Sequence, residues 1–369
     1  MPSSTSATPE LSVIVPVLNE VDGIEGFFRM LARQEGTGFE VVLSDGGSSD
    51  GTVDKVLQAA GGYSFPVEVL HGERGRARQM NSGAAAAHGE WLLFLHADSL
   101  LPDPQSLNTA LSLLREESAR CCSGRVMGHF VLRFDQGDKE PRFGYLFCEA
   151  KARLDRPYCT LGDQGLILPK RFFAEVGPFD ESLPMGEDVV LAEMVRRCGR
   201  IILLPSEIVT SPRRFETEGF RKRQTLNAII MACIGIGRTS LLESLPALYR
   251  SQNRSRPLDL LTCFREIGVR IAEMPFRERW AFWHAIGRYV RDNAWQLALM
   301  LDVRRSLALG KPPEGGDGRM LALYDRFLDR LTDHPPGRWL TAGLVRVWFI
   351  MSRGRVYQGE MMGGNNRPM

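Results

Sequence analysis

Polar and charged residues gather in a few short loops between apolar segments of this chain. Four such loops occur in the first hundred or so residues: PVLNE (16–20), SDGGSSDGT (44–52), HGERGRARQ (71–79) and HADSLLP (96–102). Two more follow, and these read TLGDQG (160–165) and MGED (185–188). Carboxylates suit cation binding and proton transfer, whereas arginines and glycine-rich turns suit phosphate oxygens. The loops therefore predict a site for a phosphorylated ligand and a divalent cation.

His96 and Asp98 are the candidate metal ligands. They follow a strongly apolar segment, and a spacing of two residues puts both side chains on the same side of an extended chain. A cation held there could bridge two phosphates and neutralise charge on a leaving group. Mg²⁺ prefers oxygen ligands, so Asp98 is the main candidate, and His96 would suit Mn²⁺ or support the site from behind. The alternative is that Asp98 only caps the next turn.

Glu187 and Asp188 are the candidate catalytic acids, because they open a helical pattern directly after a glycine-containing turn. One of them could take the proton from an acceptor hydroxyl. The alternative is that both only stabilise the positive end of the helix dipole.

Arginines surround Gly75 just ahead of an alanine-rich helical segment, at positions 74, 76 and 78. Guanidinium groups and free N–H groups at a helix start bind phosphate oxygens. The segment is no P-loop, because no GK[ST] follows the glycines. A second basic pair, Arg213 and Arg214, could also hold phosphate, and the alternative for both groups is a solvated basic surface.

The loop around Gly47 allows a second interpretation. Its glycines permit close approach of the backbone to a ligand, or they merely close a tight turn. Residues 47–51 also match GxSxG, which would make Ser49 the nucleophile of a hydrolase. We reject the hydrolase, because no HGGG-type segment is present and only one strand precedes the proposed elbow strand.

The elements that must position these loops alternate between strand and helix. Strands are predicted at 11–17, 40–44, 67–70 and 91–96, and helices at 23–33, 52–60, 77–88 and 104–117. This alternation predicts an α/β fold, with a mainly parallel sheet and helices on both faces. Ligands of such sheets bind beyond the carboxyl ends of the strands, which is where the polar loops fall.

Beyond residue 125 the pattern continues with a strand at 126–134, a helix near 143–155, a helix at 189–198 and a strand at 201–204. From about residue 216 it is almost wholly helical. We therefore expect a disordered N-terminus (1–10), an α/β domain (11–220) and a helical C-terminal domain of unknown role (221–369).

Composition narrows the setting. The 369 residues carry a formal net charge of +2, so no global field attracts nucleic acid. Seven scattered cysteines without a CxxC pair, and no secretory pattern at the N-terminus, favour the cytoplasm. The apolar segment 226–237 has basic flanks and is too short to span a bilayer, so it predicts weak peripheral contact with the inner face of the membrane or, alternatively, an ordinary core helix.

In this order, the segments VIVPVLNE, SDGGSSDGT, LHADS, GDQG through PMGED, and TSPRR resemble the inverting family 2 glycosyltransferases with the GT-A fold, in a bacterial branch with an LHAD metal motif. The resemblance covers about residues 11–215. It implies a sugar transferred, with inversion, from a UDP- or GDP-linked donor to an acceptor hydroxyl, with Mn²⁺ or Mg²⁺ and with a lipid-linked acceptor among the candidates.

The resemblance also implies roles for single residues. Nucleoside contacts fall to Pro16, Asn19, Glu20, Asp45 and the Gly47 loop; base or phosphate contacts to Arg74, Arg78 and the Arg213–Arg214 pair; the metal to Asp98; the sugar or acceptor to Asp163 and Gln164; and the catalytic base to Asp188. His96 stands where the family's metal motif has Asp, which leaves the choice of metal open. The QxxRW motif of processive synthases is missing, so transfer of single sugars is expected.

Two rivals from other classes remain open. One is a binding protein for nucleotide sugars that has lost the chemistry. The other is a sugar nucleotidyltransferase, although the first loop lacks the glycine-rich basic run that would hold a triphosphate.

Overall fold

The computed structural model describes residues 8–121, 123–137, 142–245, 258–311 and 318–363, with side chains up to residue 353. Most of the predicted disordered N-terminus, residues 1–7, lies outside the described residues. The chain divides into two compact units. The first comprises Met1–Glu140, Lys151–Ser182 and Glu187–Pro212, and the second comprises Pro141–Ala150, Leu183–Gly186 and Arg213–Met369. The domain boundary at residue 220 stays a prediction.

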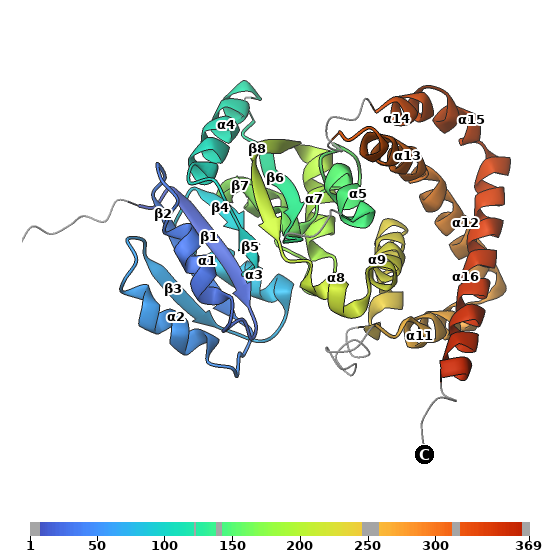
Figure 1. Cartoon of the computed structure of the whole chain (residues 1–369), viewed down its shortest axis with the longest axis horizontal. Helices are drawn as coiled ribbons and strands as arrows, with labels where there is room; N and C mark the ends of the chain where they lie inside the picture. The colour runs from blue at the N-terminus through green and yellow to red at the C-terminus, as the bar shows by residue number, and fades with distance from the viewer. Residues whose placement is uncertain (1–7, 122, 138–141, 246–257, 312–317, 364–369) are drawn as a thin grey trace, which may run out of the picture. The chain divides into compact units, whose positions relative to one another are not determined.

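The first unit is built on an eight-stranded sheet in the order β3-β2-β1-β4-β7-β6-β8-β5 (Figure 1). The strands are β1 (Leu11–Val17), β2 (Phe39–Asp45), β3 (Val67–His71), β4 (Trp91–Phe94), β5 (Ser99–Leu100), β6 (Val126–Phe134), β7 (Leu166–Pro169) and β8 (Arg200–Thr210). Its helices are α1 (Ile24–Leu31), α2 (Thr52–Ala60), α3 (Arg76–Ala86), α4 (Ser106–Arg120), α6 (Lys170–Val176) and α7 (Glu187–Cys198), together with the short 3-10 helix η1 (Gly162–Gln164).

The sheet is mainly parallel, which confirms the predicted fold class. Strands β1 to β4 pair in parallel, and β6 pairs in parallel with β8. Only β7 and β5 run against their neighbours. Strands β1 and β2 are buried along almost their whole length, as expected for apolar strands covered on both faces.

Helix α3 packs closely on the sheet, and this contact fixes the start of the helix near the strand ends. A Cβ atom added to Gly83 would lie 2.5 Å from a methyl carbon of Ile14 in β1. A glycine is therefore needed at this position for the helix to approach the strand so closely. Residues Met80 and Ala84 complete the buried face of α3.

The second unit is helical, as predicted. Its α-helices are α5 (Phe143–Ala152), α8 (Arg213–Glu218), α9 (Phe220–Gly235), α11 (Leu260–Glu273), α12 (Phe276–Asp292), α13 (Trp295–Ala308), α14 (Arg319–Leu323), α15 (Asp329–Thr332) and α16 (Pro335–Gly363). The core of this unit is formed by α9, α11 and α12, with Leu226, Phe264 and Ile286 among its buried side chains. No helix in the described ranges is long and apolar enough to cross a membrane.

The apolar segment 226–237 belongs largely to that core. Leu226, Ile229, Ile230 and Cys233 of α9 are all buried. These side chains are not available to lipid, so the core helix, the alternative to a membrane-interface segment, describes them better. Any membrane contact must come from another surface of the chain.

Two glycines in helices of the first unit give a matched test of the packing. Gly83→Ala should destabilise the protein by ~1–3 kcal/mol, because the new methyl group overlaps Ile14. Gly26→Ala should stabilise it by ~0.4–1 kcal/mol, because the added Cβ meets nothing within 4 Å and only the unfolded chain loses freedom. Urea denaturation midpoints measure both, and equal shifts for the two variants would contradict the tight contact between α3 and β1.

Candidate active site

The polar loops meet at one edge of the sheet. Strands β1, β2 and β4 point their carboxyl ends toward this edge, and β7 begins there because it is antiparallel to β4, with Leu166 opposite Phe94. The segment before β7, which contains η1, therefore comes close to the residues that follow β4. This pairing joins two polar loops that are far apart in the sequence.

Asp188 and His96 both lie close to Gly162. The Gly162 N–H donates to one carboxylate oxygen of Asp188 at 2.5 Å, and the Val189 N–H donates to the other at 2.9 Å. A Cβ at Gly162 would lie 2.8 Å from the Asp188 carboxylate and 3.3 Å from His96 Nε2. The predicted base and one of the two predicted metal residues thus converge on the same glycine.

The strand geometry assumed for His96 and Asp98 is wrong. Strand β4 ends at Phe94, and residues 97 and 98 form a turn in which the Ser99 N–H donates to the His96 carbonyl at 3.1 Å. The two side chains therefore do not share one side of an extended chain. The Asp98 carboxylate is exposed, whereas His96 is half-buried.

Asp163 sits beside these carboxylates in a strongly desolvated position. Burial, followed by the negative charge of Asp188, raises the pKa of Asp163 to about 7, while Arg76 opposes the rise and Asp98 adds to it. One oxygen of this carboxyl group is buried without a hydrogen-bond partner in the described part of the chain. Near neutral pH, Asp163 therefore carries a proton for a large part of the time.

Glu187 has a partner that the sequence did not suggest. It is only 5% exposed, and its carboxylate lies 3.7 Å from Nε of Arg76, the first residue of α3. Because the same guanidinium also acts on Asp163, Arg76 is the cation that faces the group of acids. Glu187 thereby helps to position Arg76.

Gln164 is turned away from the exposed edge. Its side chain is buried, and its Nε2 donates to the carbonyl of Cys159 at 2.8 Å. This contact holds the loop before β7 in place. A role of Gln164 toward a sugar stays a prediction.

The first two polar loops are joined by hydrogen bonds. Asn19, in the left-handed region with φ 58°, donates its N–H to Ser48 Oγ and accepts the Ser49 N–H on its side chain, both at 2.9 Å. The Glu20 N–H donates to Thr52 Oγ1 at 2.9 Å. These bonds join the loop after β1 to the loop after β2. Pro16 and Gly47, which are predicted to bind the nucleotide, lie at these two loops.

Asp45 stabilises the turn of the second loop. It is buried at the end of β2, and its carboxylate accepts the N–H groups of Gly47 and Ser48 at 3.0 and 3.1 Å. Nε2 of buried Gln79 donates to the carbonyls of Val17 and Ser44 at 2.8 and 2.7 Å, and these two hydrogen bonds connect the ends of β1 and β2. Any contact from Asp45 to a nucleoside must therefore coexist with a turn-stabilising role.

Arg76 is itself exposed, and the predicted arginines differ from it in their partners and not in their exposure. Arg78 is exposed and pairs with Glu73 and Glu181 on the surface, and Arg74 is exposed. Arg213 and Arg214 open α8 in the second unit. Their roles toward a donor stay predictions.

Helical periodicity separates Arg76 from the other two arginines around Gly75, and it also marks Gln79, which the pattern of polar loops did not single out. Arg76 lies three residues before Gln79, and both precede the buried face made by Met80, Gly83 and Ala84. Position 78 falls on the opposite side of the helix, toward solvent. The sequence signal that marks Arg76 and Gln79 is their spacing from the alanine-rich stretch that follows them.

Among the described residues, no group of three or more His, Cys, Asp and Glu side chains could by itself hold a metal ion. An exposed Asp98 beside the other carboxylates fits a different kind of site. Mg²⁺ and similar ions bind through one or two carboxylates together with substrate phosphates. The donor set therefore fits a cation that arrives with a phosphorylated ligand.

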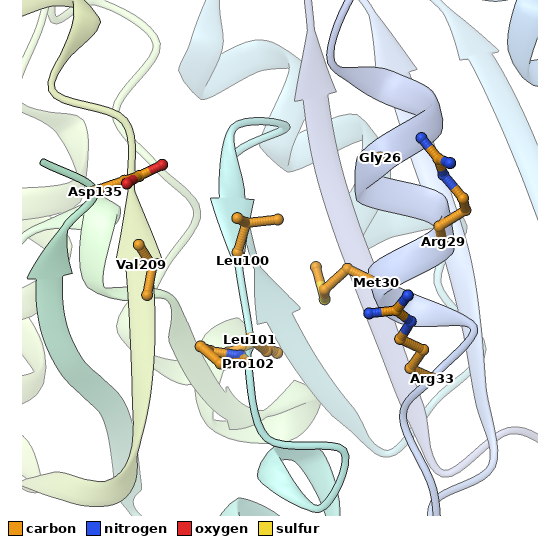
Figure 2. A pocket seen from close by; sticks show the side chains of 9 residues that line it. All are labelled: Gly26, Arg29, Met30, Arg33, Leu100, Leu101, Pro102, Asp135 and Val209. Atoms are coloured by element: carbon orange, nitrogen blue, oxygen red, sulfur yellow. The ribbon is translucent and has the colours of Figure 1, made fainter. Parts of the chain in front are cut away.

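A separate pocket of about 510 Å³ lies between α1 and the β5–β8 edge of the sheet. Figure 2 shows Met30 of α1 and Leu100 of β5 facing each other across it. Its lining contains none of the predicted site residues. It is therefore distinct from the candidate active site.

Comparison with known proteins agrees with the resemblance noted in the sequence. A PGL/p-HBAD biosynthesis glycosyltransferase of Mycobacterium bovis is 30% identical over 176 residues, which cover 47% of this chain and 64% of that protein. The glycosyltransferase AglE of Haloferax volcanii is 29% identical over 208 residues, which cover 56% of this chain and 67% of that protein. The chain thus spans less than two thirds of the length of the mycobacterial relative.

A solved structure resembles the whole chain in fold. The mannosyltransferase PcManGT from Pyrobaculum calidifontis, in complex with GDP-Man and Mn²⁺, is 19% identical, with a TM-score of 0.50 over 93% of this chain and 88% of that one. This likeness supports the predicted GT-A fold. Residues 12–168 match the family model described as Glycosyl transferase family 2, so this part of the chain is similar to that family.

Proposed function

We propose that this protein transfers a hexose from a nucleoside diphosphate donor to an acceptor hydroxyl, with inversion at the anomeric carbon and with the help of a divalent cation. The observation that carries the proposal is the meeting of Asp188, His96 and Gly162 at the edge where the strand-end loops gather. The family match over residues 12–168 supports sugar transfer as the chemistry. A GDP- or UDP-linked donor is the ligand class that we propose.

In this mechanism Asp188 is the base. Two backbone N–H groups hold its carboxylate in one orientation, and each oxygen keeps a further lone pair for the acceptor proton. The hydroxyl oxygen attacks the anomeric carbon as Asp188 removes its proton, and the bond to the diphosphate breaks on the opposite side. A single displacement of this kind inverts the configuration.

Arg76 lies near Glu187 and Asp163 and could stabilise the departing diphosphate, with Glu187 holding its guanidinium. The joined loops around Asn19 and Gly47 would receive the nucleoside. Asp163, when protonated, can donate a hydrogen bond to the sugar or to the acceptor without adding negative charge.

The residues that would hold the cation are Asp98, with His96 as a second ligand or as its support. When bound, Mn²⁺ or Mg²⁺ supplies positive charge that stabilises the leaving phosphates. The crowding of negative charge around Asp163 supports a cation at this edge.

We further propose that the protein belongs to the bacterial branch with the LHAD motif, and that it works on the cytoplasmic side of the membrane in weak peripheral contact with it. The segment 95–98 and the scattered cysteines support these proposals. An acceptor linked to lipid would fit this location.

Product analysis separates the proposed transferase from its rivals. With a panel of UDP- and GDP-linked hexoses, a transferase releases nucleoside diphosphate. A nucleotidyltransferase working in reverse consumes pyrophosphate, and a binding protein changes neither. Tight binding of a nucleotide sugar without any diphosphate release, even with candidate acceptors present, would leave the binding protein as the explanation.

The first prediction concerns the cation. In thermal melting with UDP or GDP, the wild-type protein should gain stability only when Mn²⁺ or Mg²⁺ is also present, by ~2.7 kcal/mol at a hundredfold excess over the dissociation constant. Chelator should remove the gain, Asp98→Ala should lose most of it, and His96→Ala should lose less. Asp54→Ala, which removes an exposed acid in α2, is the control. An unchanged metal-dependent gain in Asp98→Ala would contradict the assignment.

The second prediction concerns the base. Asp188→Asn should slow transfer by about 10²–10⁴-fold, because the amide cannot accept the acceptor proton. Nucleotide binding should hardly change, whereas the melting temperature should fall slightly, because one of the two backbone hydrogen bonds loses its acceptor. Asp180→Asn, at an exposed acid in the preceding turn, should transfer normally. Near-normal transfer by Asp188→Asn would end its candidacy and direct attention to Asp163 or Glu187.

The third prediction concerns pH. Between about pH 4 and pH 7 folded Asp163 keeps a proton that the unfolded chain has lost, so its contribution to stability falls as the pH rises through this window. Asp163→Asn removes that loss. The variant should therefore match the wild type near pH 4 and exceed it by ~1–4 kcal/mol at pH 8, since each pKa unit corresponds to ~1.4 kcal/mol. Denaturant titrations of the metal-free protein at both pH values test this, and a difference that does not depend on pH would refute it.

A further inference from the structure

Helix α16 of the second unit carries an apolar face that no part of the described chain covers. Leu340, Leu344, Val347 and Ile350 are 66%, 61%, 53% and 58% exposed. Their spacing of three and four residues places them on one side of the helix. Contiguous apolar surface of this kind marks an interaction site rather than ordinary scattered exposure.

The opposite face of α16 holds the helix to its own unit. Helix α16 contacts α12 and α11, and Figure 1 shows it running beside them. A Cβ added to Gly287 of α12 would lie 2.7 Å from the backbone of Ala342, and the Phe349 ring contacts Phe264 and Trp283. The outer face is therefore not needed to fold the unit.

The charged residues of α16 between positions 335 and 353 are all of one sign. Residues 335–353 contain no Asp or Glu, and their charged residues are Arg338, Arg346 and Arg353. Arg346 is exposed and lies at one border of the apolar face, whereas Nη1 of Arg353 lies 3.0 Å from the position that a Cβ at Gly268 in α11 would take. Arg338 is half-buried and forms an ion pair with Asp333.

Aromatic rings extend the face toward the start of α12. The Trp280 ring lies 4.7 Å from Trp339 of α16 and 6.5 Å from Phe276. Phe276 and Trp280 are 73% and 52% exposed. Tryptophan is enriched where protein meets the headgroup level of a bilayer.

We propose that this face, Leu340 to Ile350 with the Trp280–Trp339 rings, rests in the interface of an anionic lipid bilayer, with α16 parallel to the membrane plane. Apolar side chains enter the acyl boundary while Arg346 meets anionic headgroups. A second copy of the chain fits less well, because residues 335–353 of its α16 would bring more arginines and no carboxylate to the seam. This inference rests on the proposed function, which places the protein at a membrane. Lipid binding can still be measured without sugar transfer, so the two proposals can fail separately.

Flotation of the full-length protein with lipid vesicles tests the proposal. At low salt the protein should float with vesicles of phosphatidylcholine and phosphatidylglycerol (about 7:3), and less so with phosphatidylcholine alone. Leu344→Glu should lower the partition coefficient by about tenfold or more, because a charge replaces a buried apolar group. Arg346→Gln should lower it by about fivefold on anionic vesicles only, which is the order expected for one basic residue.

Leu57→Glu is the matched control, because Leu57 is a leucine with 57% exposure on α2 of the first unit. It should float like the wild type. Position 344 is 61% exposed, so Leu344→Glu should melt near the wild-type temperature and still bind UDP or GDP as the wild type does. These two measurements show that any loss of flotation is a loss of the surface and not of the fold.

Three outcomes would overturn the proposal. The wild type fails to float with anionic vesicles, Leu344→Glu floats as well as the wild type, or light scattering shows a dimer that Leu344→Glu disperses while no vesicle binding occurs. Flotation without any nucleotide binding or transfer would instead contradict only the proposed function. Transfer without flotation would contradict only the proposed membrane contact of α16.

Discussion

The hydrogen bond from the Gly162 N–H to the Asp188 carboxylate is the interaction on which the candidate site depends. It joins the loop before β7 to the start of α7, and it places Asp163 and His96 in the same small volume. A Cβ at position 162 would lie 2.8 Å from the Asp188 carboxylate and 3.3 Å from His96 Nε2, so a side chain there would displace Asp188 and crowd His96. The pairing of β7 with β4 makes the contact possible, because it brings the loop to the carboxyl end of β4.

The closeness of these groups also brings negative charges together near Asp163, and the proposed transfer reaction can use them to bind a cation. Burial raises the pKa of Asp163 to about 7, the charges of Asp188 and Asp98 add to the rise, and Arg76 opposes it. Asp163 therefore keeps a proton for much of the time near neutral pH, and the negative charge of its neighbours favours any cation that reaches the edge. Arg76 cannot turn away freely, because buried Glu187 pairs with it. The arrangement therefore fits a ligand that brings its own metal and leaves as an anion.

The two units of the chain present different surfaces. The first exposes a polar edge built from strand ends, whereas the second exposes an apolar helix face with an arginine at its border. Helix α9, which carries most of the apolar segment 226–237, instead contributes its buried side chains to the core of the second unit. Hydropathy along the chain could not distinguish these cases, because α9 and α16 both show apolar residues at helical spacing and only packing decides which face remains open.

The sequence by itself determined the α/β fold, the helical C-terminal region and the loops that carry chemistry, because strand and helix periodicity and glycine-rich turns are local properties. It could not determine that Arg76 faces the acids while Arg78 pairs with Glu181 on the surface, because that depends on how α3 packs at Gly83. Nor could it show that the chain turns after Phe94, or that Gln164 is buried against Cys159. These features arise from contacts between segments far apart in the sequence, and only the tertiary structure decides them.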